Sequence, residues 1–456
     1  MISLARKLRL ADFFSLGFGT MVGVGWLVVM DDWLSRGGPL GGVLGFVIGG
    51  ALLLPIGIVY GHLVRAMPDA AGEIAYTAAV FPRPVGYATG WMMLLAYYIV
   101  CPWEAVAIGR IAGYLFPALN CIELYRVTGK PVYLPHLVIG LALTAFLTVL
   151  NYRGIRLSAT FQNWTTFGVI ALTLCFVAAG ATRGSVANFH PLFNGSALVS
   201  VFLVLQIVPY FMTGFESIGK ASEEASREFE PSQFMIAILL AIVVGASFYA
   251  TVIAAVAYVA PWQSIVHERF ATTVAFERAM GSRWIVRLIM TTALLSLLKV
   301  FNGNLVAASR LLFALGRRGL ADIRLGEVHP VNHTPSVAVV CIGIATASLM
   351  FGGESLLVPI TEVGSLAAAL GWMASCGSYL RMRPSMLGQA AAVAGLLVTA
   401  LMVLMKVLPQ APGHFNAYEW IALAGWVGVG MLLRRNPADR SSKPVIFHEG
   451  RRSRRL

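Results

Sequence analysis

Four glycines lie within nine residues of the first long apolar stretch, in the run Gly17-Phe18-Gly19-Thr20-Met21-Val22-Gly23-Val24-Gly25-Trp26. Glycine destabilises a helix by about 1 kcal/mol relative to alanine, so this run predicts a helix that is interrupted inside a membrane. Unpaired amide and carbonyl groups are tolerated at that depth only where protein or a water-filled cavity contacts them, and they can bind a small charged solute. The alternative is close helix packing through small residues. The spacing disfavours a dinucleotide-binding loop.

A second interruption is predicted in the run from Val208 to Glu224. Pro209 removes one main-chain donor, and Gly214 weakens the helix that follows. Glu216 falls where the surrounding sequence is still apolar. The charged stretch after it, residues 223–230, is interpreted as a solvated loop.

Three further charged side chains fall within apolar stretches, where burying a charge is costly and each such residue is a functional hypothesis. Glu104 is six residues from Arg110, which places the two on different faces of a helix. Glu104 either forms a structural ion pair or faces a substrate, whereas Arg110 can extend to the membrane surface. Lys299 lies about one turn before Asn302, and its alternative role is to reach the lipid headgroups.

The composition places these residues in an all-α integral membrane protein, because 58% of the 456 residues are hydrophobic and 12% are charged. Apolar stretches of about 20 residues are long enough to cross a bilayer as helices. The sequence predicts twelve transmembrane helices, which start near residues 12, 40, 84, 133, 157, 197, 231, 285, 335, 356, 386 and 415.

The net charge of +13 does not indicate nucleic acid binding, because of where the charges fall. Most of the Lys and Arg residues lie on one side of the predicted helices, which by the positive-inside rule places both termini in the cytoplasm. We therefore expect a multi-pass protein of the plasma membrane, the inner membrane of a bacterium. The basic tail, residues 436–456, is expected to be solvated or to contact lipid headgroups.

The interrupted helices are the first and the sixth, and so begin two groups of five. An odd number of helices per group gives the two groups opposite orientations, and matching interruptions indicate a transporter's binding site at the middle of the membrane. The predicted organisation is a transport core (1–383, with halves of about 10–180 and 195–383), two peripheral helices (384–435) and the tail (436–456).

With these motifs in place, the chain resembles the amino acid-polyamine-organocation (APC) superfamily of secondary transporters, and the bacterial amino acid permeases in particular. The resemblance implies a 5+5 inverted-repeat core of the leucine-transporter type with discontinuous helices 1 and 6, and neither a catalytic group nor a cofactor. The segments that carry it are Gly23-Val24-Gly25-Trp26, Gly214-Phe215-Glu216-Ser217, Ser222-Glu223-Glu224-Ala225, Asn302-Gly303-Asn304, Ser309-Arg310-Leu311-Leu312, Gly316-Arg317-Arg318-Gly319 and the tract from His329-Pro330 to Thr334-Pro335.

The resemblance also implies which groups bind a substrate. Amides from Met21 to Gly25, at the positive end of a helix dipole, would hold its carboxylate, and carbonyls of the sixth helix and of residues 17–20 would hold its ammonium. Phe215 and Trp26 would close the pocket toward the outside. The expected substrate-binding residues are Gly19, Thr20, Met21, Val22, Gly23, Val24, Gly25, Trp26, Glu104, Phe211, Met212, Thr213, Gly214, Phe215 and Glu216.

Two departures from the family concern coupling. Some proton-coupled relatives carry a lysine in the fifth helix, and residues 162–169 contain none. Lys299 intrudes where sodium-dependent relatives bind the ion. Burial disfavours the charged form of a lysine, so Lys299 could replace the sodium ion or carry a proton, with Glu104 as its counter-ion and Asn302 nearby.

The predicted function is therefore secondary active transport of a small amino acid, proton-coupled or exchanging and independent of sodium. A polyamine or other organic amine is the alternative substrate, since Glu104 and Glu216 would favour an extra positive charge if they faced the pocket. A channel or a sensory protein could share the hydropathy. Neither a metal-ligand spacing nor a nucleophile motif occurs at membrane depth in the sequence.

Overall fold

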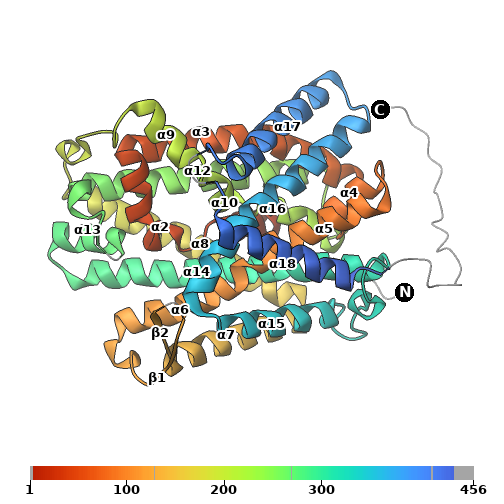
Figure 1. Ribbon diagram of the computed structural model, residues 1–456, viewed down its shortest axis with the longest axis horizontal. Helices are drawn as coiled ribbons and strands as arrows, with labels where there is room; N and C mark the ends of the chain where they lie inside the picture. Colours follow the sequence, from red (N-terminus) through yellow and green to blue (C-terminus); the bar gives the residue numbers. More distant parts are fainter. Residues whose placement is uncertain (1–3, 128, 269, 412–413, 436–456) are drawn as a thin grey trace, which may run out of the picture.

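The computed structural model describes residues 4–127, 129–268, 270–411 and 414–435; the predicted basic tail therefore lies outside the described residues. Long helices run along the horizontal axis of Figure 1, with α2 and α13 at one end and α4 near the N-terminus at the other. Together, the described helices form a bundle around one large apolar core.

The first part of the bundle consists of α1 (Leu10–Met21), α2 (Gly25–Val28), α3 (Met30–Ala66), α4 (Glu73–Ala78), α5 (Arg83–Tyr98), α6 (Val100–Leu115), α7 (Leu134–Arg153) and α8 (Ile155–Ala181). The second part consists of α9 (Ala197–Leu205), α10 (Val208–Met212), α11 (Ser217–Lys220), α12 (Gln233–Val259), α13 (Ala271–Met280), α14 (Arg283–Arg317), α15 (Ser336–Met350), α16 (Gly353–Arg381), α17 (Met386–Val407) and α18 (Ala417–Leu433). Short 3₁₀ helices are η1 (Pro117–Leu119), η2 (Val186–Phe189), η3 (Ser222–Glu224), η4 (Trp262–Ser264) and η5 (Ile323–Gly326).

Eight helices among the described residues are long and apolar enough to cross a membrane, and nine if the bent pair Ala197–Leu205 and Val208–Lys220 counts as one span. Two shorter apolar helices, α15 and α18, accompany them. The chain is thus a multi-pass helical membrane protein. The count of twelve and the inverted repeat stay predictions.

Both helices that the sequence predicts to be interrupted are interrupted. The chain leaves the helix after Met21 and resumes at Gly25, with an extended conformation at Val22 (φ −88°, ψ 92°). The α9–α10 segment bends by 46°, and a further break separates α10 from α11. Gly214 lies in that break with φ 140°, a conformation that favours glycine.

The prediction of an all-α chain misses one hairpin. Strands β1 (Glu123–Val127) and β2 (Lys130–Tyr133) pair antiparallel between α6 and α7. A Thr-Gly pair between two short runs with β-forming residues was the available sequence signal, and Gly129 has φ 83°.

The last helix, α18, packs on the rest of the bundle through an aromatic side chain. Trp426 of α18 stacks on Trp91 of α5 with ring centroids 4.5 Å apart. Each indole N–H donates to the other residue's carbonyl, at 3.0 and 3.1 Å. Such paired indoles fix α18 against α5.

Glycines of α3 let the helix that precedes the second break approach closely. A Cβ added to Gly45 would lie 2.7 Å from Cβ of Val204, and one added to Gly49 would lie 3.0 Å from Cβ of Val208. The face that Gly41 shares with them is therefore a packing surface, and it positions α9 and α10 beside the core.

We predict that Gly45→Ala lowers the melting temperature in detergent, since overpacking of this kind costs about 1–3 kcal/mol. The matched control is Gly425→Ala, because Gly425 is exposed on α18 and a Cβ there meets nothing within 4 Å. That control should be neutral or slightly stabilising. Equal melting temperatures for both variants would contradict the packing assignment.

Candidate functional site

Side chains of α14 hold the carbonyls of the interrupted first helix. The Ser296 hydroxyl donates to the carbonyls of Val22 at 3.1 Å and Gly23 at 2.8 Å. The Asn304 amide donates to the carbonyl of Thr20 at 3.3 Å. These donors replace hydrogen bonds that a continuous helix would have made.

Lys299 of α14 and Tyr249 of α12 complete this set. The Lys299 ammonium donates to the carbonyl of Val22 and lies 5.2 Å from the centroid of the Phe18 ring. The Tyr249 hydroxyl donates to the carbonyl of Met21 at 3.1 Å. Lys299 is fully buried, so its charge is offset by a carbonyl and an aromatic face.

The amides of the same break differ from its carbonyls in their hydrogen-bond partners. Within the described residues, the amides of Gly23, Val24 and Gly25 donate to no main-chain carbonyl. All three residues line a cavity. The break thus has its carbonyls capped by protein. The amide of Gly23 lies within hydrogen-bonding reach of the Tyr249 hydroxyl, so the amides of Val24 and Gly25 are the ones left for an anionic group.

The cavity has a volume of about 380 Å³ and lies between the two interrupted helices, α5–α6, α14 and α16. It extends from buried Thr20 to partly exposed Asp32 and Arg36. Sequence-predicted residues that line it are Thr20, Met21, Gly23, Val24, Gly25, Glu104, Phe211 and Thr213.

The second interrupted helix contributes carbonyls to this cavity. Among the described residues, the carbonyls of Phe211 and Thr213 accept no hydrogen bond from a main-chain amide. The Phe211 ring packs directly on Gly25, so that a Cβ there would overlap it. Amides from one break and carbonyls from the other therefore line one cavity.

Glu104 of α6 lies at the inner part of the cavity. It is 3% exposed, and its Oε2 has no hydrogen-bond partner among the described residues. A Cβ added to Gly23 would lie 3.0 Å from its Oε1, so the carboxyl group sits against the break. Its charge interacts with that of Lys299.

The two aromatic residues expected to close the pocket do not line it in this structure. Trp26 is fully buried and stacks on Phe176, with centroids 5.6 Å apart. Phe215 is fully buried against Trp372 and Tyr60, at centroid distances of 5.4 and 5.9 Å. Aromatic residues that do line the cavity are Trp103, Tyr210 and Phe211.

Other expected site residues also lie outside the cavity lining. The Glu216 carboxylate is fully buried and accepts from the amide of Gly214 at 3.1 Å, so it supports the second break rather than the cavity. Gly19 faces Gln162 of α8. The remaining expected residues outside the lining are Val22, Met212 and Gly214.

Asn302 belongs to a separate buried network. Its Oδ1 accepts from Asn151 at 2.8 Å and from Ser158 at 3.2 Å, and its Nδ2 donates to Gln162 at 2.7 Å. Gln162 in turn donates to the carbonyl of Ser15 at 3.2 Å. Asn302 therefore ties α14 to α7, α8 and α1, and it does not line the cavity.

Buried ion pairs lie at the other end of the bundle. Lys220, just after the second break, pairs with Glu73 at 2.5 Å, and both side chains are fully buried. Tyr60 donates to the same carboxylate at 2.7 Å. Arg310 makes two contacts with Glu224, at 3.0 and 3.2 Å, again with no exposure.

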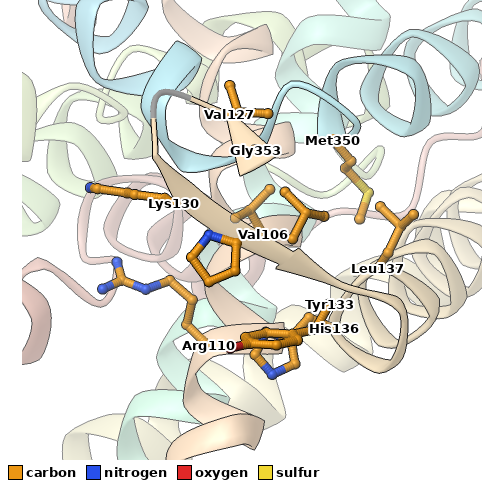
Figure 2. A pocket seen from close by; sticks show the side chains of 11 residues that line it. Val106, Arg110, Val127, Lys130, Tyr133, His136, Leu137, Met350 and Gly353 are labelled. Atoms are coloured by element: carbon orange, nitrogen blue, oxygen red, sulfur yellow. The ribbon is translucent and has the colours of Figure 1, made fainter. Parts of the chain in front are cut away.

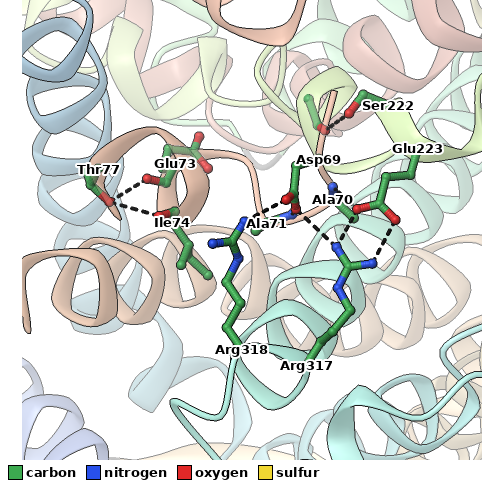
Figure 3. Close-up of polar contacts among 11 residues, drawn as sticks. Asp69, Ala70, Ala71, Glu73, Ile74, Thr77, Ser222, Glu223, Arg317 and Arg318 are labelled. Carbon is green, nitrogen blue, oxygen red and sulfur yellow. Dashed lines mark hydrogen bonds and ion pairs between the residues drawn. The ribbon is translucent and has the colours of Figure 1, made fainter. Parts of the chain in front are cut away.

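Figure 3 shows a more exposed cluster beside them, in which Arg317 reaches both Asp69 and Glu223. Arg318 pairs with Asp69 at 2.6 Å. Burial raises the pKa of Asp69, but Arg318, the Ala71 amide and Arg317 together hold its net pKa below the ordinary value. The interpretation of 223–230 as a solvated loop is therefore wrong at its start, because these acidic residues bind α14.

A second, smaller pocket of about 70 Å³ lies under the hairpin (Figure 2). Arg110, Tyr133 and His136 line it from α6, β2 and α7. Arg110 also lines the large cavity. The hairpin thus packs beside the cavity's more exposed part.

Comparisons with known proteins identify the family. A family model described as amino acid permease matches residues 8–432. The chain is similar to the branched-chain amino acid permease BcaP of Bacillus subtilis, at 27% identity over 80% of this chain and 77% of that one. It is also similar to two other B. subtilis proteins, the methylthioribose transporter (25%; 80% and 79% covered) and the aspartate-proton symporter (24%; 73% and 65% covered).

We predict that Glu224→Gln destabilises the protein by about 3–5 kcal/mol, because it leaves Arg310 buried without its counter-charge. Thermal unfolding in detergent measures the effect. Glu123→Gln is the matched control, since the Glu123–Arg126 pair is exposed and such pairs contribute little. An unchanged melting temperature for Glu224→Gln would rule out the buried pair.

Proposed function

The chain belongs to the amino acid permease family, and from that premise we propose that it carries a neutral amino acid by alternating access, without sodium. Amino acid transport itself follows from the family and its relatives. The proposal adds the class of substrate, the site and the coupling.

One observation carries the site: within the described residues, Val24 and Gly25, whose amides donate to no main-chain carbonyl, line the same cavity as Phe211 and Thr213, whose carbonyls accept from no main-chain amide. A zwitterion has an anionic and a cationic end two bonds apart, and it needs such donors and acceptors side by side. An amine without a carboxylate would leave the amides empty. This supports an amino acid over a polyamine.

The charges of the cavity support a neutral side chain. Asp32 pairs with Arg36 at 2.7 Å, and Glu362 pairs with Lys406 at 2.5 Å. Two of the three carboxylates that line the cavity, Asp32 and Glu362, are therefore paired with a cation. Glu104, whose Oε2 has no hydrogen-bond partner among the described residues, remains for a single positive charge, the ammonium of a neutral amino acid.

Alternating access would open the end of the bundle that is closed by ion pairs. We infer that the cavity faces the outside here, with the ion pairs of Lys220 and Arg310 on the cytoplasmic side with both termini. The full proposal retains twelve helices, two inverted halves within residues 1–383, two peripheral helices in 384–435 and the bacterial inner membrane.

Lys299 is the proposed coupling residue. It binds the carbonyl of Val22 one residue before the amides that line the cavity, and it interacts with Glu104. A proton arriving at this pair would change the charge beside the substrate. A relative that is a proton symporter is consistent with such coupling.

The first test is a thermal-shift panel followed by counterflow in liposomes. Neutral amino acids should raise the melting temperature, because a ligand at 100 times its Kd adds about 2.7 kcal/mol to the free energy of unfolding. Alanine amide, which lacks the carboxylate, should not raise it. Counterflow should then saturate with the same ligands. Stabilisation by alanine amide equal to that by alanine would refute the carboxylate cradle, and current without counterflow would indicate a channel.

We predict that Lys299→Gln abolishes the stimulation of uptake by an inward proton gradient, because the titrating group is removed. Lys7→Gln serves as control, since the Lys7 side chain is exposed. Initial uptake of a labelled substrate with and without the gradient measures the effect. A full response to the gradient in Lys299→Gln would end the coupling hypothesis.

A further inference from the structure

Gln206 lies between α9 and α10, at the bend of the second interrupted helix. Its side chain is 6% exposed, yet neither Nε2 nor Oε1 has a hydrogen-bond partner within the described residues. Gln206 lines the large cavity. Burying an amide group without hydrogen-bond partners costs free energy, so we expect a ligand or water to bind to the Gln206 amide.

Water can satisfy part of this amide. A side pocket of about 20 Å³, lined by Gln206, Ser365 and Lys406, lies behind it. That volume holds about one water molecule, whereas a glutamine amide offers two donor hydrogens and two acceptor lone pairs. The remaining positions face the large cavity, where a substrate would lie.

The surroundings of Gln206 restrict what can bind there. Ser365 of α16 lines both the cavity and the side pocket, and adds a hydroxyl. The nearest charges, Glu362 and Lys406, pair with each other at 2.5 Å. The subsite is therefore polar but charge-balanced, and it suits an uncharged group that both donates and accepts.

The spacing along the helix sets the length of that group. Gln206, Tyr210 and Thr213 all line the cavity. Gln206 lies at the 46° bend before α10 and Thr213 follows its last residue, so the two residues are separated by the length of this helix, about 8 Å for five residues. A substrate whose ammonium lies at Thr213 reaches Gln206 only with an extended side chain, so serine is too short.

We propose that Gln206 and Ser365 form a subsite for the side-chain carboxamide of the substrate, which makes glutamine the preferred neutral amino acid. This inference rests on the proposed function. The proposed substrate differs from the branched-chain amino acids in the name of the B. subtilis relative BcaP. An aliphatic side chain would leave the Gln206 amide unpaired.

The test compares initial counterflow of glutamine, leucine and serine into liposomes for the full chain and for Gln206→Leu. The wild type should prefer glutamine to leucine, and Gln206→Leu should lower the glutamine-to-leucine ratio about tenfold and reduce glutamine exchange more than serine exchange. Gln389→Leu is the matched control, because Gln389 is exposed on α17 and outside the cavity lining.

The outcomes separate the two proposals. Serine exchange with an unaltered glutamine-to-leucine ratio, or a wild type that prefers leucine, would overturn the carboxamide subsite and leave amino acid transport standing. Absence of exchange for every amino acid would overturn the proposed function itself. If Gln206→Leu does not fold, Gln206→Asn and Ser365→Ala decide, since each should reduce glutamine exchange more than serine exchange.

Discussion

A main chain that leaves a helix inside an apolar bundle must find new hydrogen-bond partners, and most of this structure serves that constraint. The carbonyls of residues 20–23 lose their helical partners at the break, so α14 and α12 supply donors from Ser296, Lys299, Asn304 and Tyr249. These donors come from elements more than 200 residues away along the chain. The interrupted helix is thus a tertiary feature, stable only because the second part of the bundle packs against the first.

The hydrogen-bond partners are distributed unequally between the carbonyls and the amides, and the proposed transport mechanism depends on that difference. Protein donors cover the carbonyls of the first break, whereas in the proposal the amides of Val24 and Gly25 and the carbonyls around Phe211 bind the ligand. A ligand that binds both would bridge the two interrupted helices. The buried pairs of Lys220 with Glu73 and of Arg310 with Glu224 then hold the opposite end closed, so that one end can be accessible while the other is not.

Features that depend on local composition could be predicted from the sequence, and those that depend on distant partners could not. The glycines of 17–25 indicated the first break because propensity acts locally. Glu224 was interpreted as solvated, since its partner Arg310 is 86 residues away. Trp26 and Phe215 were assigned to the pocket, but the direction a side chain takes after a break is set by packing. The unpaired amide of Gln206 has no sequence signal, because the sequence does not show which polar side chains lack a partner after folding.

Hydrogen–deuterium exchange of the purified protein, with and without a transported amino acid, tests most directly whether bare main-chain groups bind the substrate. Peptides that cover residues 22–26 should exchange quickly in the free protein and become protected when the amino acid is added. Peptides from the packed glycine face of α3, residues 41–50, should exchange slowly in both states. Slow exchange at residues 22–26 in the free protein, unchanged by any transported amino acid, would contradict the role given to the break.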